Sequence, residues 1–212
     1  MEIIAHRGFW LEPEEKNTIP AFRRALCAGF GIETDIRDYD QNLVISHDIP
    51  SSKSVTLEEF LSLVFEINPS ITLALNVKAD GLNKHLLELD RLETIPHFYF
   101  DMSVPDMLGY VKNKQTLYSR YSDIEEYPAL YSESNGIWLD NFTSSELRTD
   151  KLVQFIKDDK SVALVSPELH GFEYENYWCS IKQLINENPD ISSKIKLCTD
   201  YPDKAKRYFC ES

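Results

Sequence analysis

The chain has 212 residues, of which 42% are hydrophobic and 27% charged; these are the proportions of a globular protein and exclude wholesale disorder. Asp and Glu outnumber Lys and Arg by 35 to 22, and the resulting net charge of −13 argues against a nucleic acid as the partner. No apolar run approaches the roughly 20 residues that span a bilayer, so we expect no stable membrane insertion.

The first residues and the cysteines predict a cytoplasmic protein. The opening segment MEIIAHRGFW has neither the basic start nor the long apolar stretch of a secretory signal. The four cysteines form no C-x-x-C pair and no spacing typical of a metal site, so we expect reduced thiols.

Short strand patterns alternate with helical patterns along the first half of the chain. Thr18 precedes a proline in the first turn of a predicted helix that ends near Gly29, and Thr56 opens a capping box that includes Glu59. The predicted strands are 3–6, 31–38, 43–47, 72–78 and 98–101, and the predicted helices are 18–29, 56–65, 82–92 and 105–112.

The second half continues this alternation. Its predicted strands are 116–119, 136–140, 161–166 and 195–199, and its predicted helices are 149–158, 180–188 and 203–209. With 43–47 counted as an accessory strand, eight main strands remain, which predicts a compact (β/α)8 TIM barrel forming a single domain over residues 1–212. A doubly wound open sheet is the alternative, but no glycine-rich phosphate loop follows the first strand.

Polar residues follow the ends of the predicted strands, where barrels build their active sites. His6 and Arg7 end the first strand, and Glu33 and Asp35 lie two residues apart on the second, so both carboxylates face the barrel interior. Two inward carboxylates cost several kcal/mol in desolvation unless they are paired or bind a metal. Later strands end in Asp101, Asp140, Glu168 with His170, and Asp200.

The inward acids leave two interpretations open. Carboxylate oxygens favour Mg²⁺ or Ca²⁺, and such an ion beside Arg7 and Lys78 would create a positive pocket for a phosphate. In the rival interpretation Arg7 and Lys78 simply form ion pairs with the acids. Because His6 and His47 could act as general base and general acid, the residues suggest metal-assisted cleavage of a phosphodiester.

Four motifs carry a resemblance to a known family. They are His6-Arg7-Gly8, the segment from Lys16-Asn17-Thr18 to Phe22, Glu33-x-Asp35, and His47-Asp48. In this order they resemble the glycerophosphodiester phosphodiesterase family. Leu75-Asn76-Val77-Lys78 and Thr199-Asp200-Tyr201-Pro202 extend the likeness over nearly the whole chain.

The resemblance implies a (β/α)8 barrel, similar to that of phosphatidylinositol-specific phospholipase C, and a role for each matching residue. His6 and His47 would be the catalytic acid and base, and Arg7 would hold the phosphate. Glu33 and Asp35 would ligate the divalent cation. Cleavage would use a hydroxyl of the substrate as the nucleophile and would pass through a cyclic phosphate that water opens.

Two positions depart from the family pattern. Pro13-Glu14-Glu15-Lys16 stands where the family has Pro-Glu directly before Asn-Thr, and the more serious departure lies on the third main strand. The family usually has Glu as a third metal ligand two residues before the lysine, and this chain has Asn76 there. Either the Asn76 amide ligates the ion, or Glu168 compensates from another strand, or the metal site is degenerate and the substrate differs.

We therefore expect hydrolysis of a small soluble glycerophosphodiester to glycerol phosphate and an alcohol. The alternatives are a sugar or polyol phosphodiester as substrate, a reaction that stops at the cyclic phosphate, and a catalytically silent barrel that only binds phosphate.

Overall fold

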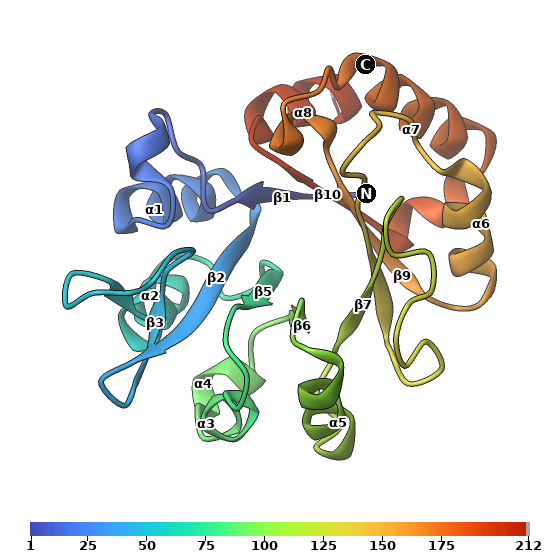
Figure 1. Cartoon of the computed structure of the whole chain (residues 1–212). Coiled ribbons are helices and arrows are strands. Elements are labelled where there is room, and N and C mark those ends of the chain that lie inside the picture. The colour runs from blue at the N-terminus through green and yellow to red at the C-terminus, as the bar shows by residue number, and fades with distance from the viewer. Residues whose placement is uncertain (211–212) are drawn as a thin grey trace. The chain divides into compact units, whose positions relative to one another are not determined.

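The computed structural model describes residues 1–210 and divides into two compact units (Figure 1). The N-terminal unit is Ile4–Leu117, coloured from blue to green, and the C-terminal unit is Met1–Ile3 with the described residues from Tyr118 onward. The prediction that the whole chain forms a single domain stays a prediction.

The N-terminal unit is built on parallel strands in the order β1 (Glu2–His6, of which this unit holds the part from Ile4), β2 (Gly31–Tyr39), β5 (Leu73–Val77) and β6 (His97–Phe100). Its register sets His6 beside Glu33, and Asp35 beside Asn76. The end of β2 extends further and pairs antiparallel with β3 (Asn42–Ile45), which pairs with β4 (Val55–Thr56). The polar ends of β1, β2 and β5 are thereby adjacent.

Helices in the N-terminal unit bury apolar faces next to this sheet. They are α1 (Ile19–Ala28), α2 (Leu57–Ile67), α3 (Asn83–Leu87), α4 (Asp90–Glu93) and α5 (Val104–Lys112), with a short 3-10 turn, η1 (Pro13–Glu15). Phe22 of α1 contacts Phe60 of α2 with ring centroids 4.5 Å apart, and both rings are fully buried. The predicted capping box is confirmed, because Thr56 Oγ1 accepts from the Glu59 amide at 3.2 Å.

The C-terminal unit repeats the strand and helix alternation. Its parallel strands pair in chain order, β7 (Tyr118–Tyr121), β8 (Gly136–Leu139), β9 (Ser161–Val165) and β10 (Ile195–Thr199). The helices are α6 (Thr149–Lys157), α7 (Glu175–Glu187) and α8 (Pro202–Cys210), with the 3-10 turns η2 (Pro167–His170) and η3 (Pro189–Lys194). The eight main strands predicted from the sequence are therefore all present as β1, β2 and β5 to β10.

Two of the predicted helices are wrong in extent. The pattern over 82–92 forms two short helices, because Leu89 leaves the helical conformation at ψ 84°. In one continuous helix Leu86 and Leu92 would lie roughly 120° apart around the axis, whereas the break allows both to be buried. The helix predicted over 180–188 begins at Glu175, since Ser180 bonds the Asn176 carbonyl inside the helix instead of capping it.

Two smaller predictions also differ from the structure. The strand predicted over 116–119 is displaced to Tyr118–Tyr121. Thr18 does precede α1, but its hydroxyl donates to the Glu15 carbonyl at 2.5 Å and makes no cap bond.

The four cysteines are free thiols in the structure. Within residues 1–210, no helix combines the length and the apolar character needed to cross a membrane.

Candidate functional site

A tight turn at the end of β1 orients Arg7. Its backbone is left-handed at φ 56°, and its amide donates to the Glu33 carbonyl at 2.9 Å. Gly8 follows at φ 86°, and a Cβ there would meet the backbone and Cβ of Ala21 at 3.0 Å. Only glycine combines that conformation with so close an approach to α1, so the fold itself requires Gly8 at this turn.

Glu33 is a buried carboxylate that accepts few hydrogen bonds. Its side chain is 2% exposed, and its Oε2 lies 3.2 Å from the Arg7 amide nitrogen and 3.8 Å from His6 Nε2. Burial and the neighbouring Asp35 carboxylate raise the pKa of Glu33 to about 8, although Arg7 and Lys78 act in the opposite direction. A nearby cation would favour the ionised form of this acid.

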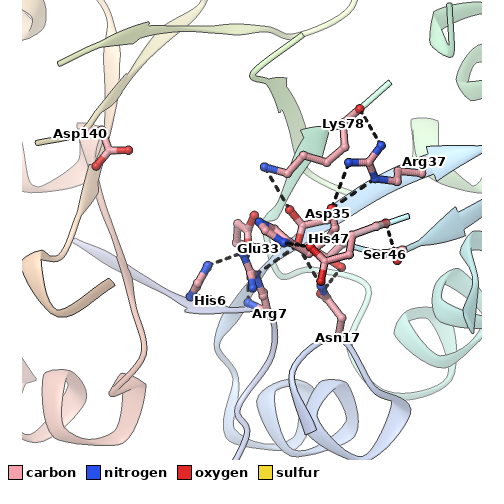
Figure 2. A network of polar contacts seen from close by, with 12 residues as sticks. His6, Arg7, Asn17, Glu33, Asp35, Arg37, Ser46, His47, Lys78 and Asp140 are labelled. Atoms are coloured by element: carbon pink, nitrogen blue, oxygen red, sulfur yellow. Dashed lines mark hydrogen bonds and ion pairs between the residues drawn. The ribbon is translucent and has the colours of Figure 1, made fainter. Parts of the chain in front are cut away.

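Asp35 is the point on which the basic side chains converge (Figure 2). Arg7 Nε lies 3.2 Å from its Oδ2, and Lys78 Nζ lies 3.4 Å from its Oδ1. Asn17 Nδ2 donates to Oδ2 at 2.9 Å, while Oδ1 of the same Asn17 amide accepts from the Thr34 hydroxyl at 2.8 Å. The structure therefore brings His6, Arg7, Glu33, Asp35 and Lys78 together, as predicted.

Asn76 completes an oxygen-rich corner beside Asp35. It is 7% exposed, and its Oδ1 is buried without a hydrogen-bond partner in the part of the chain that the structure describes. No group of three His, Cys, Asp or Glu side chains suited to a metal occurs among the described residues. Two carboxylates with an unsatisfied amide oxygen are nevertheless hard donors of the kind that Mg²⁺ and Ca²⁺ prefer. The residues at this corner fit such an ion.

His47 reaches the same region from the loop after β3. The Ser46 amide donates to the Asp35 carbonyl at 3.1 Å, and the Arg37 side chain donates twice to the His47 carbonyl, at 3.1 and 3.3 Å. A third Arg37 bond, 3.2 Å long, goes to the Lys78 carbonyl (Figure 2). The His47 ring is 45% exposed, and its Nδ1 lies 3.0 Å from Asp48 Oδ1.

Asn17 and Arg37 are site residues to which the sequence prediction gave no role. Arg37 lies two residues after Asp35 on β2, so the same period-two alternation that united Glu33 and Asp35 would have included it. Asn17 adopts the left-handed conformation at φ 60°, which asparagine tolerates better than most residues. No periodic pattern in the sequence predicts that the loop before α1 contacts β2.

Glu168, the alternative metal ligand, lies in the C-terminal unit. Its carboxylate accepts hydrogen bonds from the Ser166 and Thr199 hydroxyls and from the Asp200 amide. Burial raises its pKa, and these bonds oppose the shift. The contacts give Glu168 a structural role at the ends of β9 and β10, and its role as a ligand stays a prediction.

Comparisons with known proteins agree with this fold. The sequence matches no family model and no curated protein. A glycerophosphodiester phosphodiesterase from Agrobacterium tumefaciens strain C58 has a similar solved structure, with a TM-score of 0.71 and 16% identity over 98% of both chains. A second structure from that strain, provisionally named a glycerophosphoryl diester phosphodiesterase, has a TM-score of 0.70 and 14% identity over 100% of this chain and 98% of the other.

These likenesses confirm the fold class predicted from the strand count, a (β/α)8 barrel. They also agree with the resemblance carried by the four motifs, since both structures bear names from the family that the motifs indicated. At this level of identity the comparison establishes that the chain has the fold of solved glycerophosphodiester phosphodiesterases.

Proposed function

We propose that this protein is a phosphodiester hydrolase that acts on a small glycerophosphodiester with the help of a divalent cation. The observation that carries the proposal is the buried pair Glu33 and Asp35, flanked by His6, Arg7 and Lys78. The four motifs and the shared fold support the same reaction class. The net charge of −13 supports a small-molecule substrate over a nucleic acid.

Arg7 and Lys78 are suited to hold the phosphate of the substrate. Both side chains are about a fifth exposed, and both are fixed by Asp35 rather than free to rotate. A guanidinium offers several donors in one plane, and an ammonium offers three more, so both can bind phosphate oxygens while they keep Asp35 as a partner. Because these positions are already fixed, less side-chain conformational entropy is lost when a phosphate binds.

His6 and His47 are suited to transfer protons on either side of the phosphorus. One imidazole takes the proton of the attacking hydroxyl as the new P–O bond forms, and the other gives a proton to the leaving alkoxide as the old bond breaks. When the attacking hydroxyl belongs to the substrate, the product is a cyclic phosphate. Water opens it with the two histidines in exchanged roles, so protons balance over the cycle.

Glu33, Asp35 and the Asn76 amide oxygen would hold the divalent cation. When bound there, Mg²⁺ or Ca²⁺ would neutralise negative charge that develops on the phosphate oxygens. The carboxylates would then be ionised at neutral pH, and Glu33 would remain close enough to His6 to orient its ring.

A silent phosphate-binding barrel is the second candidate function, and Asn76 favours it. With an amide in place of a third carboxylate, the two acids are partly neutralised by Arg7 and Lys78 without any metal. Such a protein would bind phosphate esters without turning them over.

The two candidates differ in a turnover assay. We expect the wild type to release alcohol from glycerophosphocholine or a related glycerophosphodiester in the presence of Mg²⁺, Ca²⁺ or Mn²⁺, and to lose activity in EDTA. His6→Ala and His47→Ala should each lower the turnover number by about 10²–10⁴-fold. The matched control is His85→Ala, because His85 is an exposed histidine on α3.

Equal turnover in the wild type and in either active-site variant would contradict the proposal. Binding of the substrate without turnover on any diester, with all metals, would establish the silent barrel. Accumulation of a cyclic phosphate would show that the reaction stops after the first step.

A further inference from the structure

Three hydrogen bonds hold Asn17 between the loop before α1 and the acidic strand β2. Its backbone amide donates to the Arg7 carbonyl at 2.9 Å, and its Oδ1 accepts from the Thr34 hydroxyl at 2.8 Å. Its Nδ2 donates to Asp35 Oδ2 at 2.9 Å (Figure 2). Because an ionised carboxylate only accepts hydrogen bonds, the Asn17 amide must turn its nitrogen toward Asp35. The orientation of this side chain is therefore fixed at both ends.

The two oxygens of Asp35 differ in what surrounds them. Asp35 is 1% exposed, and its Oδ2 receives the Asn17 hydrogen bond and lies 3.2 Å from Arg7 Nε. Within residues 1–210 Arg7 Nε makes no aligned hydrogen bond, so Arg7 contributes its charge to Oδ2. Oδ1 is buried without a hydrogen-bond partner in the same range, and Lys78 Nζ lies 3.4 Å from it as an ion pair. Asn17 thus determines which oxygen of Asp35 remains available.

The other oxygen donors of the candidate cation site have a similar restriction. Glu33 Oε2 accepts the Arg7 backbone amide at 3.2 Å, so one of its two oxygens also has a protein donor. Asn76 lies beside Asp35 in the register of β2 and β5 and has a single amide oxygen to offer. Each of the two carboxylates therefore has one oxygen committed to the protein.

This restriction bears on which divalent cation the site accepts. Ca²⁺ takes six to eight oxygens and often uses both oxygens of one carboxylate. Mg²⁺ takes six ligands in a strict octahedron, commonly through one or two carboxylates with water completing the shell. A carboxylate that has one oxygen committed to a protein donor is suited to the second arrangement, because it supplies one ligand atom in a fixed direction.

We propose that Asn17 is a positioning residue that makes the cation site prefer Mg²⁺ to Ca²⁺. By holding Asp35 Oδ2, it limits Asp35 to one ligand oxygen, Oδ1. Asn17 acts through Asp35, as groups that orient a metal ligand do in other proteins. The inference rests on the proposed function, which requires a cation at Glu33, Asp35 and Asn76 but does not specify which one.

The test is titration calorimetry of the full-length protein without substrate, with MgCl₂ and CaCl₂ added in separate experiments. We expect the wild type to bind Mg²⁺ more tightly. The main variant is Asn17→Gly, because glycine accepts the left-handed backbone at φ 60° while the amide is removed. It should lose about 10–100-fold in Mg²⁺ affinity. The loss for Ca²⁺ should be smaller, because Asp35 Oδ2 becomes available as a second ligand.

Two further variants separate positioning from a purely structural role. Thr34→Val keeps Asn17 but removes the hydroxyl that holds its amide, so it should move the ratio of the two affinities in the same direction by a smaller factor. Glu15→Gln is the matched control, because Glu15 fixes the same loop through the Leu11 amide and Arg24 and makes no contact with Asp35. It should leave the ratio unchanged, even if thermal unfolding shows a lower stability.

The affinity ratio also decides against the inference. A folded Asn17→Gly with the wild-type ratio overturns it and leaves the proposed hydrolysis standing, and Thr34→Val decides in the same way if Asn17→Gly does not fold. An equal change of the ratio in Glu15→Gln overturns it as well, since the loop and not the amide is then responsible. A wild type that binds Ca²⁺ more tightly also contradicts it. Binding of neither ion overturns both this inference and the cation of the proposed function.

Discussion

Two glutamates, the buried Glu33 in one unit and the half-buried Glu168 in the other, differ in how many hydrogen bonds their carboxylates accept. Glu168 accepts from two hydroxyls and one backbone amide, and these donors come from the ends of β9 and β10. Glu33 accepts from the Arg7 amide at 3.2 Å and has Asp35 as a neighbour of the same charge. Burial raises the pKa of both acids, but at Glu33 the second carboxylate adds to the effect.

We propose that this difference separates a structural acid, Glu168, from a functional one, Glu33. A carboxylate with its acceptor positions filled stabilises the strands that supply the donors. A buried ionised carboxylate that has few hydrogen-bond donors and lies next to an unsatisfied amide oxygen destabilises the protein. Binding of a proton or a cation removes this cost. By this criterion we propose Glu33, Asp35 and Asn76 as the site and expect Glu168 to be part of the framework.

The largest expected effect is a contrast between Glu33→Gln and Glu168→Gln. Glu33→Gln should lower kcat/KM by about 10²–10³-fold, since it removes a cation ligand next to His6. Its metal-free stability should be retained, because Gln resembles the protonated acid that burial favours. Glu168→Gln should instead lower the free energy of unfolding by about 1–3 kcal/mol, with activity per folded molecule unchanged. Urea unfolding and steady-state kinetics measure both.

This prediction would be contradicted if Glu168→Gln remained folded and lost as much activity as Glu33→Gln. Glu168 would then be the compensating metal ligand, and its hydrogen bonds would orient it for that role.

The second prediction concerns pH in the absence of metal. The pKa of Glu33 is raised from 4.5 to about 8 in the folded state, so the folded protein keeps a proton that the unfolded chain has released. The resulting stability is fully present below about 4.5 and is lost as pH rises through about 8. The slope reaches at most about 1.4 kcal/mol per pH unit. Urea unfolding in EDTA measures it across that window.

Glu33→Gln is the control for this pH effect, and its stability should depend less on pH than that of the wild type. Saturating Mg²⁺ or Ca²⁺ should reduce the same dependence in the wild type by stabilising the ionised acid. An identical profile in the wild type and Glu33→Gln would show that Glu33 titrates normally.

The third prediction sharpens the role of Asn76. Asn76→Glu adds a third carboxylate beside Asp35 and should tighten binding of Mg²⁺ or Ca²⁺ by about tenfold in Kd, because affinity for these ions rises with ligand charge. Titration calorimetry measures the affinity. Asn76→Gln has the same length as Asn76→Glu without the charge, and equal affinity in these two variants would place the cation elsewhere.

The smallest predicted effect concerns Arg37, which donates to the carbonyls of His47 and Lys78. Arg37→Lys keeps the charge but cannot reproduce these bonds, so we expect kcat to fall by several-fold to about tenfold with little change in KM. Arg23→Lys on the exposed face of α1 is the matched control. An unchanged kcat in Arg37→Lys would show that the loop after β3 is positioned without this side chain.

The sequence was sufficient to predict most of the elements and the proximity of five site residues. An extended run identified β2, alternation identified β5, and the turn residues at Gly8 mark the end of β1. Parallel pairing then places consecutive strand ends together, which is why His6, Glu33 and Asp35 could be grouped. The prediction of one helix over 82–92 was wrong because a local pattern contains no information about which leucines the core accommodates.

By itself the sequence determined the fold class and the types of residues at the site, since periodicity and strand-end position are local properties of the chain. Only the tertiary structure determined which carboxylates have their hydrogen-bond acceptor positions filled. It alone showed that Glu168 receives hydroxyl donors, that Asn76 Oδ1 has no partner within residues 1–210, and that Asp140 binds both Arg120 and His170. Hydrogen bonds between residues far apart in the chain depend on distances in space, and no spacing along the sequence specifies them.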